Sequence, residues 1–387
     1  ITDEPKKKEP WTLNHNKTCR YPRKWIDGNI KLPCFLSDVY VQYREVNSQK
    51  LEAFERSKTI TVGDTTVRVC ANWYTQTVRN IYKVFIVLYK NGIFPSPAHK
   101  VIATPYNVPN NIVHKGSQRF LFKLYEPEND VLWVTPYVIG NEGDTSLWVR
   151  PHFAEILEQM VVLYKMTHYT DPQAFCLIGD GAGADAVVRL APPILHHFAG
   201  VALTNCRQFS THELKAFVNI PIWYNPICKV YMNLHHLDEW INWVDFRENA
   251  YNVSGSRPVL KHLPFRNPRN AILSSIEIQK FLYGKTRDEY PQRVVWHQPA
   301  GPKHAHFYWL SLPDTRIEEA ITITAYRDSN RLIYIKCEQE SVRKIMVRLH
   351  YKYISGSEKV NIIFNGKLFR AGKMKERARL IEGTLKR

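Results

Sequence analysis

The residues of this chain that could do chemistry gather at one glycine-rich turn. An apolar run, residues 175–178, leads into Gly179, Asp180, Gly181, Ala182 and Gly183, and a helix-compatible segment follows to residue 190. This order predicts a strand, a tight turn and a helix. In the pattern G-x-S-x-G, such a turn presents a nucleophilic serine at its apex. The apex here is Gly181, which has no side chain, so the sequence predicts the shape of an active site without its nucleophile.

Two other kinds of chemistry are compatible with the same turn. The Asp180 carboxylate could be a nucleophile, although this shifts the turn by one residue and places Ile178 where a small residue is needed. Residues 179–184 also fit G-x-G-x-x-A, a dinucleotide-binding pattern that follows a strand and opens a helix. The next predicted strand, 201–205, ends without the acidic residue that would bind a ribose. We therefore expect no cofactor, with both alternatives left open.

The histidines offer a weaker signal for a metal. His304 and His306 could present two imidazoles on one strand face, with His297 nearby, but no third ligand is identifiable. We therefore expect no metal site. The adjacent histidine pairs at 196–197 and 235–236 are expected to lie at the surface or at helix caps.

Composition indicates a folded, strongly basic protein. The chain has 387 residues, 44% of them hydrophobic, which suffices for two or three domains with a sizeable core. Its net charge of +17 favours an anionic partner such as RNA, an acidic lipid surface or an acidic protein. No apolar run reaches 18 residues, so we expect no transmembrane span. Seven cysteines without a C-x-x-C pair favour a reducing compartment, with Cys176 and Cys337 buried as small hydrophobes.

Alternating strand and helix patterns around the turn predict an α/β fold with a doubly wound, mostly parallel sheet. Residues 82–89 form a near-continuous apolar run, as a strand buried on both faces requires. Apolar residues at helical spacing predict a helix over 152–169. A hairpin is predicted between residues 59–62 and 67–70, across Gly63 and Asp64. The other predicted strands are 131–136, 201–205 and 220–224, and the other predicted helices are 231–249 and 268–283.

The C-terminal region predicts a small all-β module. Residues 321–325 and 332–337 alternate across a turn, and residues 360–364 turn at Asn365 and Gly366, the strongest short hairpin signal. We thus expect five segments along the chain. They are a basic N-terminal arm at 1–33, a β-rich segment at 34–80, the sheet domain at 81–289, the β-module at 290–366, and a basic tail at 367–387 that forms a charged helix or an extended arm.

Four parts of the chain carry a family resemblance. Residues 84–92 resemble a strand that ends in an LHG turn, and residues 171–179 resemble the lead into a catalytic turn. Residues 198–203 resemble the strand after it, and residues 290–296 with 307–310 resemble the start of an appended β-module. Together they make the chain resemble bacterial-type α/β-hydrolases of the esterase, prolyl-oligopeptidase-like and polyhydroxybutyrate-depolymerase-like group. The resemblance implies the α/β-hydrolase fold with a C-terminal β-module.

The resemblance also implies which residues an active member would need, and the matching positions differ here. Gly181 stands at the nucleophile, and the acid would lie within 225–229, which contain no carboxylate. The histidine would lie near Arg266, with His262 a few residues early, and the oxyanion turn, 90–92, reads Lys-Asn-Gly instead of His-Gly. Loss of a single triad member already removes most of the catalysis. The resemblance therefore implies a catalytically degenerate member.

The basic termini are the expected partner-binding segments. Residues 1–33 carry eight Lys and Arg against four Asp and Glu, and residues 367–387 carry eight against two. Short basic segments with few core-forming residues do not offset their own ordering entropy, so a partner is expected to order them. The candidate partner-binding residues are Lys6, Lys7, Lys8, Trp11, Arg20, Arg23, Lys24, Trp25, Phe369, Arg370, Lys373, Lys375, Arg377 and Arg379.

These features predict a non-catalytic accessory or structural subunit of a large organellar assembly on the mitochondrial matrix side. Its partners would be protein subunits and rRNA bound by the basic arms, and a mitochondrial ribosome fits best. A chain that starts at Ile1 would also fit a precursor whose targeting segment has been removed. The alternatives are an accessory subunit of a respiratory-chain or other membrane complex, an esterase or peptidase-type hydrolase, and a pseudoenzyme that binds a small ligand.

Overall fold

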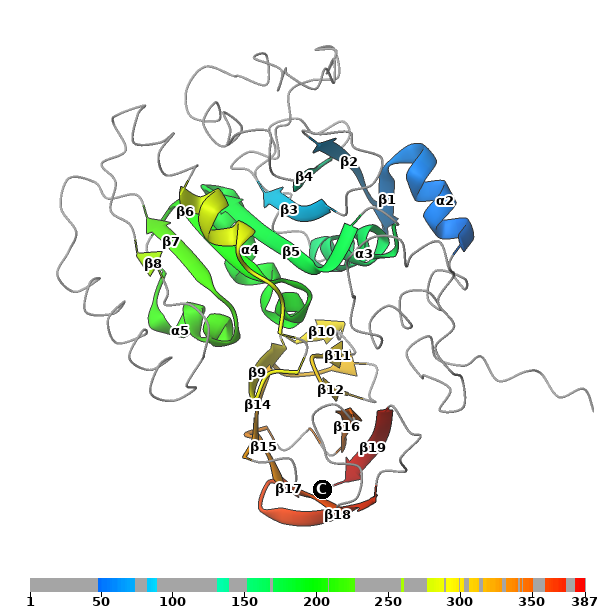
Figure 1. Ribbon diagram of the computed structural model, residues 1–387, viewed down its shortest axis with the longest axis vertical. Coiled ribbons are helices and arrows are strands. Elements are labelled where there is room, and N and C mark those ends of the chain that lie inside the picture. The colour runs from blue at the N-terminus through cyan, green and yellow to red at the C-terminus, as the bar shows by residue number, and fades with distance from the viewer. Residues whose placement is uncertain are drawn as a thin grey trace, which may run out of the picture.

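A computed structural model describes two regions of the protein, a sheet domain and a β-module (Figure 1). Among the described residues, no helix is both long enough and apolar enough to cross a bilayer. The described residues are 48–73, 82–88, 131–138, 152–167, 170–207, 209–226, 259–260, 277–288, 290–298, 300–302, 306–312, 316–328, 332–339, 342, 344–350, 359–373 and 380–386.

The sheet domain is built on one eight-stranded sheet with the order β1-β2-β4-β3-β5-β6-β7-β8. Strand β2 pairs antiparallel with both β1 and β4. In the spatial order from β4 to β8, every neighbouring pair of strands is parallel. Strands β3 and β5 lie at the centre and are buried along nearly their whole length. The strands are β1 Thr59–Val62, β2 Thr65–Trp73, β3 Tyr82–Leu88, β4 Val131–Val138, β5 Thr170–Asp180, β6 Gly200–Cys206, β7 Ile222–Pro226 and β8 Val259–Leu260.

Helices cover both faces of this sheet. Val84, Ile86 and Leu88 of β3 point into a core shared with α3 and α4, while Phe85 and Val87 point into a second core with helical residues 277–283. Alternate residues of a strand face opposite sides, so a strand with two apolar faces requires a layer on each. The expected doubly wound sheet is confirmed. The other helical elements are α2 Ser48–Ser57, α3 Phe153–Met166, α4 Ala182–Leu190, η3 Pro192–His197, α5 Thr211–Leu214 and η4 Lys215–Asn219.

The β-module contains a five-stranded sheet, a four-stranded sheet and one short strand pair. The five-stranded sheet has the order β18-β17-β15-β14-β9, and the four-stranded sheet has the order β11-β12-β16-β19. Both hairpins expected from the sequence are confirmed, β14 with β15 and β17 with β18. The strands are β9 Arg293–Gln298, β10 Gly301–Pro302, β11 His306–Phe307, β12 Leu310–Ser311, β13 Arg316–Ile317, β14 Ile321–Arg327, β15 Leu332–Cys337, β16 Lys344–His350, β17 Lys359–Phe364, β18 Lys367–Lys373 and β19 Leu380–Lys386.

The expectation of a separate basic tail from residue 367 onward, as a charged helix or an arm, is wrong. The backbone of 367–373 pairs with β17, and the backbone of 380–386 pairs with β16. Backbone pairing in a ladder satisfies the peptide groups whatever the net charge of the segment. The β-module therefore extends past residue 366 to residue 386.

The two regions meet along the edge strand β9. The Asn219 side-chain amide at the end of η4 donates to the Val295 carbonyl at 3.0 Å, and its oxygen accepts the Val295 N–H at 3.3 Å. Trp296 stacks on Phe307 with ring centroids 5.6 Å apart, and Phe307 in turn contacts His196 of η3. Trp309 is buried and donates its indole N–H to the Pro291 carbonyl at 2.9 Å. Both regions therefore contribute to one continuous core.

Candidate functional site

The glycine-rich turn forms a sharp corner between β5 and α4. Gly181 has φ 60° and ψ −120°, a conformation that residues with a side chain rarely adopt, and α4 begins at Ala182. The Gly181 N–H donates to the Thr204 carbonyl of β6 at 2.9 Å, and the Ala184 N–H donates to the Gly181 carbonyl at 3.0 Å. The expected strained turn at Gly181 is confirmed. The corner lies at the carboxyl end of the central strand, where such folds place their reactive groups.

Gly179 is required because strand and helix approach each other closely at this corner. A Cβ on Gly179 would lie 2.5 Å from the Ala184 Cα, 2.8 Å from the Ala184 nitrogen and 2.8 Å from the Gly183 carbonyl oxygen. All three atoms belong to the backbone, so no side-chain movement can relieve the contact. Gly179 thus has a packing function independent of any catalysis.

Asp180 does not occupy the apex. It is the last residue of β5 and is 3% exposed, and the positive-φ residue of the turn is Gly181. The structure therefore does not favour the reading of Asp180 as an aspartate nucleophile at the turn. The strand after the turn, β6, is followed by Arg207 and again offers no acidic residue for a ribose.

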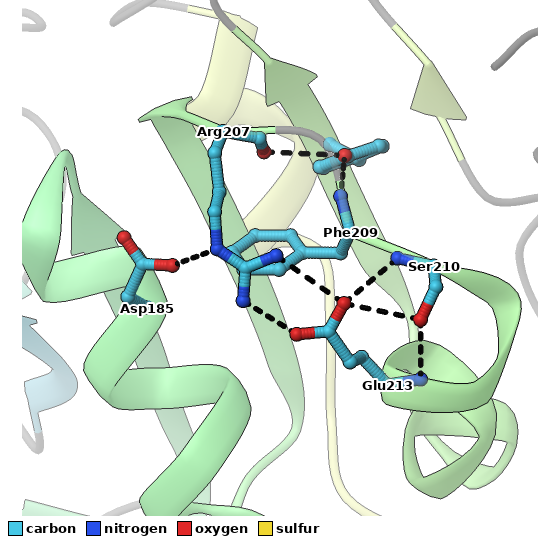
Figure 2. A network of polar contacts seen from close by, with 6 residues as sticks. Asp185, Arg207, Phe209, Ser210 and Glu213 are labelled. Atoms are coloured by element: carbon cyan, nitrogen blue, oxygen red, sulfur yellow. Dashed lines mark hydrogen bonds and ion pairs between the residues drawn. The ribbon is translucent and has the colours of Figure 1, made fainter.

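A polar network that the sequence did not predict lies beside this corner (Figure 2). Arg207 donates to Asp185 of α4 at 2.6 Å and to both carboxylate oxygens of Glu213 of α5. Ser210 and Glu213 form a capping box, in which the Ser210 N–H donates to Glu213 at 2.9 Å and the Glu213 N–H donates to the Ser210 hydroxyl at 3.3 Å. The spacing S-x-x-E was a readable signal for the cap, whereas the position of Arg207 depends on the tertiary fold.

This network fixes the loop after β6 and holds its charges in pairs. The hydrogen bond from Arg207 is the main cause that lowers the pKa of the Glu213 carboxyl. The Tyr224 hydroxyl of β7 accepts the Phe209 N–H at 2.9 Å and donates to the Arg207 carbonyl at 3.4 Å. Arg207 bridges the carboxylates of Asp185 and Glu213, and this bridge positions α4 and α5 against the loop.

The other nucleophile types near the corner are held in their protonated forms. Burial raises the pKa of the Cys206 thiol and the pKa of the Tyr224 phenol above their ordinary values. The Cys206 sulfur lies 3.9 Å from the Asn225 carbonyl. Asn225 lies near the end of β7 and is the first residue of the segment 225–229, in which the family resemblance places the acid. Within the described ends of β5, β6 and β7, the side chains do not combine a nucleophile, an acid and a histidine.

The other positions of the expected degenerate triad fall outside the described residues. These are residues 227–229, His262, Arg266 and the 90–92 turn. The helix expected at 231–249 and the histidines at 235–236 also fall outside them. Of the expected partner-binding residues, residues 1–33 and Lys375, Arg377 and Arg379 are likewise outside, and Phe369, Arg370 and Lys373 are described only as backbone of β18.

The expectation that His196 and His197 lie at the surface or at a cap is wrong. They are 7% and 4% exposed, and η3 carries them between the sheet domain and the β-module. This element precedes β6, so it lies at the amino end of the sheet, roughly 20 Å of strand away from the turn at Gly181. Neither histidine can therefore serve the corner as a catalytic base.

The described histidines of the β-module form no metal centre. The His297 Nδ1 lies 3.1 Å from the Thr322 hydroxyl, and His306 lies on β11, while His304 is outside the described residues. Within the part of the chain that the structure describes, no group of three or more His, Cys, Asp or Glu side chains could hold a metal ion. Cys176 and Cys337 are buried, as expected, and burial raises the pKa of Cys176 to about 12.

Comparisons with known proteins find similarity only among solved structures. No protein-family model and no curated protein sequence matches this chain. A thermostable esterase aligns with 59% of this chain at 11% identity and a TM-score of 0.40, and this chain covers 62% of the esterase, less than two thirds of its length. A dienelactone hydrolase from Anabaena variabilis, of which 96% is covered, aligns with 59% of this chain at 12% identity and a TM-score of 0.37. LpqC, a poly(3-hydroxybutyrate) depolymerase from Bordetella parapertussis, of which 85% is covered, aligns with 58% of this chain at 12% identity and a TM-score of 0.34.

Proposed function

We propose that this protein is a non-catalytic α/β-hydrolase-fold subunit that serves an architectural role in a large organellar assembly. The observation that carries the proposal is Gly181, which occupies the apex of the β5–α4 turn and offers no atom that can attack a substrate. Acyl transfer needs a nucleophile next to a base, and an apex without a side chain supplies neither. The proposal assigns the fold to packing and partner binding.

Two further observations support an assembly role. The contact distances at Gly179 account for this glycine by packing alone, without any catalytic role. The net charge of +17 suits a chain surrounded by a polyanion. A mitochondrial ribosome on the matrix side is the assembly that we favour, because its rRNA would neutralise this charge.

The first test restores the missing nucleophile. We expect Gly181→Ser to produce no turnover of short acyl esters, because a serine alone lacks the base that would take its proton. The unmodified protein should also remain unlabelled by a serine-reactive fluorophosphonate. Folding of the variant is checked by its thermal unfolding, since a side chain at φ 60° is strained.

Activity in either protein would contradict the non-catalytic role. Stoichiometric labelling of the unmodified chain would reveal a nucleophile elsewhere. Turnover by Gly181→Ser would show that an acid and a histidine still face the apex.

The second test concerns the N-terminal arm. Deletion of residues 1–33 removes eight basic residues and four acidic ones. If the arm contacts phosphates, RNA binding by the full chain should fall steeply with salt, and the deletion should flatten the log–log slope by roughly 0.7 to 0.9 per lost phosphate contact. The β18 and β19 strands are left intact because they belong to the module.

The nature of the partner is read from sedimentation of the native assembly. For a ribonucleoprotein, nuclease treatment should release the full chain, and the arm deletion should reduce its incorporation. Association that survives nuclease would point to a membrane complex instead. Wild-type incorporation of the armless chain would refute a role of the arm.

A further inference from the structure

The short turn between β11 and β12 holds a tyrosine in an unfavourable backbone conformation. Phe307 pairs with Leu310, so only Tyr308 and Trp309 connect the two strands. Tyr308 has φ 53°, in the left-handed region that glycine and asparagine occupy readily and that a bulky residue seldom adopts. Such a conformation persists only where the surrounding contacts outweigh its cost. The turn is therefore strained, and other contacts of the molecule must hold it closed.

The contacts that hold this turn come from η3 of the sheet domain. Strands β11 and β12 lie at the end of the β-module that is nearest to the sheet domain (Figure 1). The His196 ring meets the Phe307 ring with centroids 5.3 Å apart and the Tyr308 ring with centroids 6.1 Å apart, both in edge-to-face geometry. Phe307 and Tyr308 also pack edge to face on each other, with centroids 5.0 Å apart. His196 therefore contacts both aromatic residues at the start of the strained turn.

The closed turn accepts His196 only as a neutral ring. The side chain is 7% exposed, and its Nδ1 is buried without a hydrogen-bond partner among the described residues. A proton on this nitrogen would create a buried charge that has no acceptor, which is strongly unfavourable. Burial and the neighbouring positive charges accordingly lower the pKa of His196 well below its ordinary value.

The charged groups around His196 make protonation of the closed form more costly. Positive groups approach it from several elements, and Arg287 donates to its carbonyl at 2.7 Å. The carboxylates lie closer to other residues of the junction, since Glu158 faces the His197 Nε2 at 3.5 Å and the exposed Asp288 acts on Tyr308. The titratable and charged groups at the junction are Glu158 and Lys165 of α3, His197 of η3, Arg287 and Asp288 before β9, His306 of β11 and Tyr308 of the turn.

We infer that residues 306–311 form an acid-operated latch, which lies closed on η3 while His196 is neutral and opens locally when His196 takes up a proton from solvent. The strain at Tyr308 favours the open form, and the charge on His196 removes the contact that opposes it. Opening would uncover the Phe307 ring, which is buried in the closed form. The clamp between Asn219 and β9 is separate from the latch and would stay in place.

The direction of the pH dependence follows from the two states of His196. In the open latch the ring meets water and takes up a proton near pH 6.5, whereas in the closed latch it stays neutral well below that pH. Acid therefore favours opening. Between pH 7.5 and pH 5.5 the equilibrium constant for opening should rise about 10-fold through His196 alone.

Amide hydrogen exchange of the full chain tests the latch. After correction for the chemical exchange rate at each pH, the protection of residues 306–311 should be about 10-fold lower at pH 5.5 than at pH 7.5. Urea below the unfolding transition separates local opening from global unfolding. At pH 5.5 the exchange of residues 306–311 should respond weakly to urea, because a local opening exposes little surface, while the amides of α4 should respond steeply. Equal urea dependence of the two segments would show that acid only unfolds the whole protein, and would overturn the inference.

A matched pair of variants identifies the histidine that operates the latch. In His196→Gln the protection of residues 306–311 should be the same at both pH values, because glutamine does not titrate. In His197→Gln the change of about 10-fold should remain, because the ring that contacts the turn is still present. The opposite result, or an unchanged pH response in His196→Gln, would reject His196 as the trigger. The urea test on the unmodified chain decides the question even where a variant does not fold.

A second pair tests the strain at the turn. Tyr308→Gly and Tyr308→Ala both remove the ring, but glycine adopts φ 53° without the cost that a Cβ brings. At pH 7.5 residues 306–311 should be about 5-fold better protected in Tyr308→Gly than in Tyr308→Ala. Equal protection in the two variants, or better protection in Tyr308→Ala, would show that backbone strain does not favour opening and would reject the strained latch.

Discussion

Gly179→Ala should destabilise this protein more than any other single methyl addition that we can name in the sheet domain. The new Cβ would lie 2.5 Å from the Ala184 Cα, so α4 would have to move away from the central strand β5. Overpacking against a backbone that cannot rotate away costs about 3 kcal/mol or more. The expected result is a large fall in the denaturant midpoint of unfolding with an unchanged slope.

Gly284→Ala is the matched control for this change. Gly284 follows helical residues 277–283, and a Cβ there would meet no atom within 4 Å. We expect its unfolding midpoint to equal or slightly exceed that of the unmodified chain, since alanine loses less entropy on folding than glycine. If both variants had the same unfolding midpoint, the close contact between β5 and α4 would not be the reason for glycine at position 179.

The second large effect is acid destabilisation caused by the buried histidine pair. His196 and His197 contact each other, with ring centroids 4.0 Å apart, and both are enclosed by cationic groups. Lys165 donates to the His197 carbonyl at 2.9 Å, and the Arg287 guanidinium donates to the His196 carbonyl at 2.7 Å. The Glu158 carboxylate, 3.5 Å from the His197 Nε2, is the acidic group that faces the pair.

This environment keeps both histidines neutral in the folded protein. Burial and the neighbouring cations lower the pKa of His197 to about 4 and lower the pKa of His196 well below its ordinary value, with His306 adding to the effect on His196. Lys165 is a donor, so the His197 Nδ1, 3.4 Å from it, is the acceptor nitrogen and Nε2 carries the proton toward Glu158.

The sign of the pH dependence follows from these pKa values. In the unfolded chain each histidine takes up a proton near pH 6.5, but the folded protein resists protonation until about pH 4 at His197. The stabilisation is therefore complete above pH 6.5 and is lost as the pH falls through 6.5 toward 4. At pH 5.5 we expect a loss of about 1.4 kcal/mol from His197, and a further loss of the same sign from His196.

Urea unfolding between pH 7.5 and pH 5.5 measures this loss. The variant with His196→Gln and His197→Gln should be less stable at pH 7.5 but should show a much weaker dependence on pH in this range, because glutamine does not titrate. A variant that keeps the full pH dependence would show that other groups cause it. His297→Gln is the control. His297 lies in a half-buried site on β9, where its ring contacts the Thr322 hydroxyl.

The elements with strong local signals could be predicted from the sequence. The Asn365–Gly366 turn was readable because both residues adopt positive φ, which these residue types tolerate best. The β5–α4 corner was readable because a run of apolar residues changed to a glycine turn and then to a helix. The cores on both faces followed from continuous apolar strands such as β3.

The features that could not be predicted depend on partners distant in sequence. Adjacent histidines are polar in any local pattern, and His196 is buried because η3 packs against Phe307 and Tyr308. The basic residues after 366 suggested an arm because charge dominates that segment, but the backbone ladders to β16 and β17 decide its structure. The contacts of Arg207 with Asp185 and Glu213 join three elements that no short pattern connects.

The contact between Asn219 and Val295 has a consequence for the order of synthesis. The side-chain amide of Asn219 occupies the place of one peptide unit of a neighbouring strand and so blocks the open edge of β9 at Val295. Open edges pair with other chains, and a nascent protein is most exposed to this hazard while it is incomplete. Because Asn219 precedes β9 by more than seventy residues, it leaves the ribosome first and is already available when β9 emerges. A fragment that begins after residue 219 would lack this protection and should self-associate.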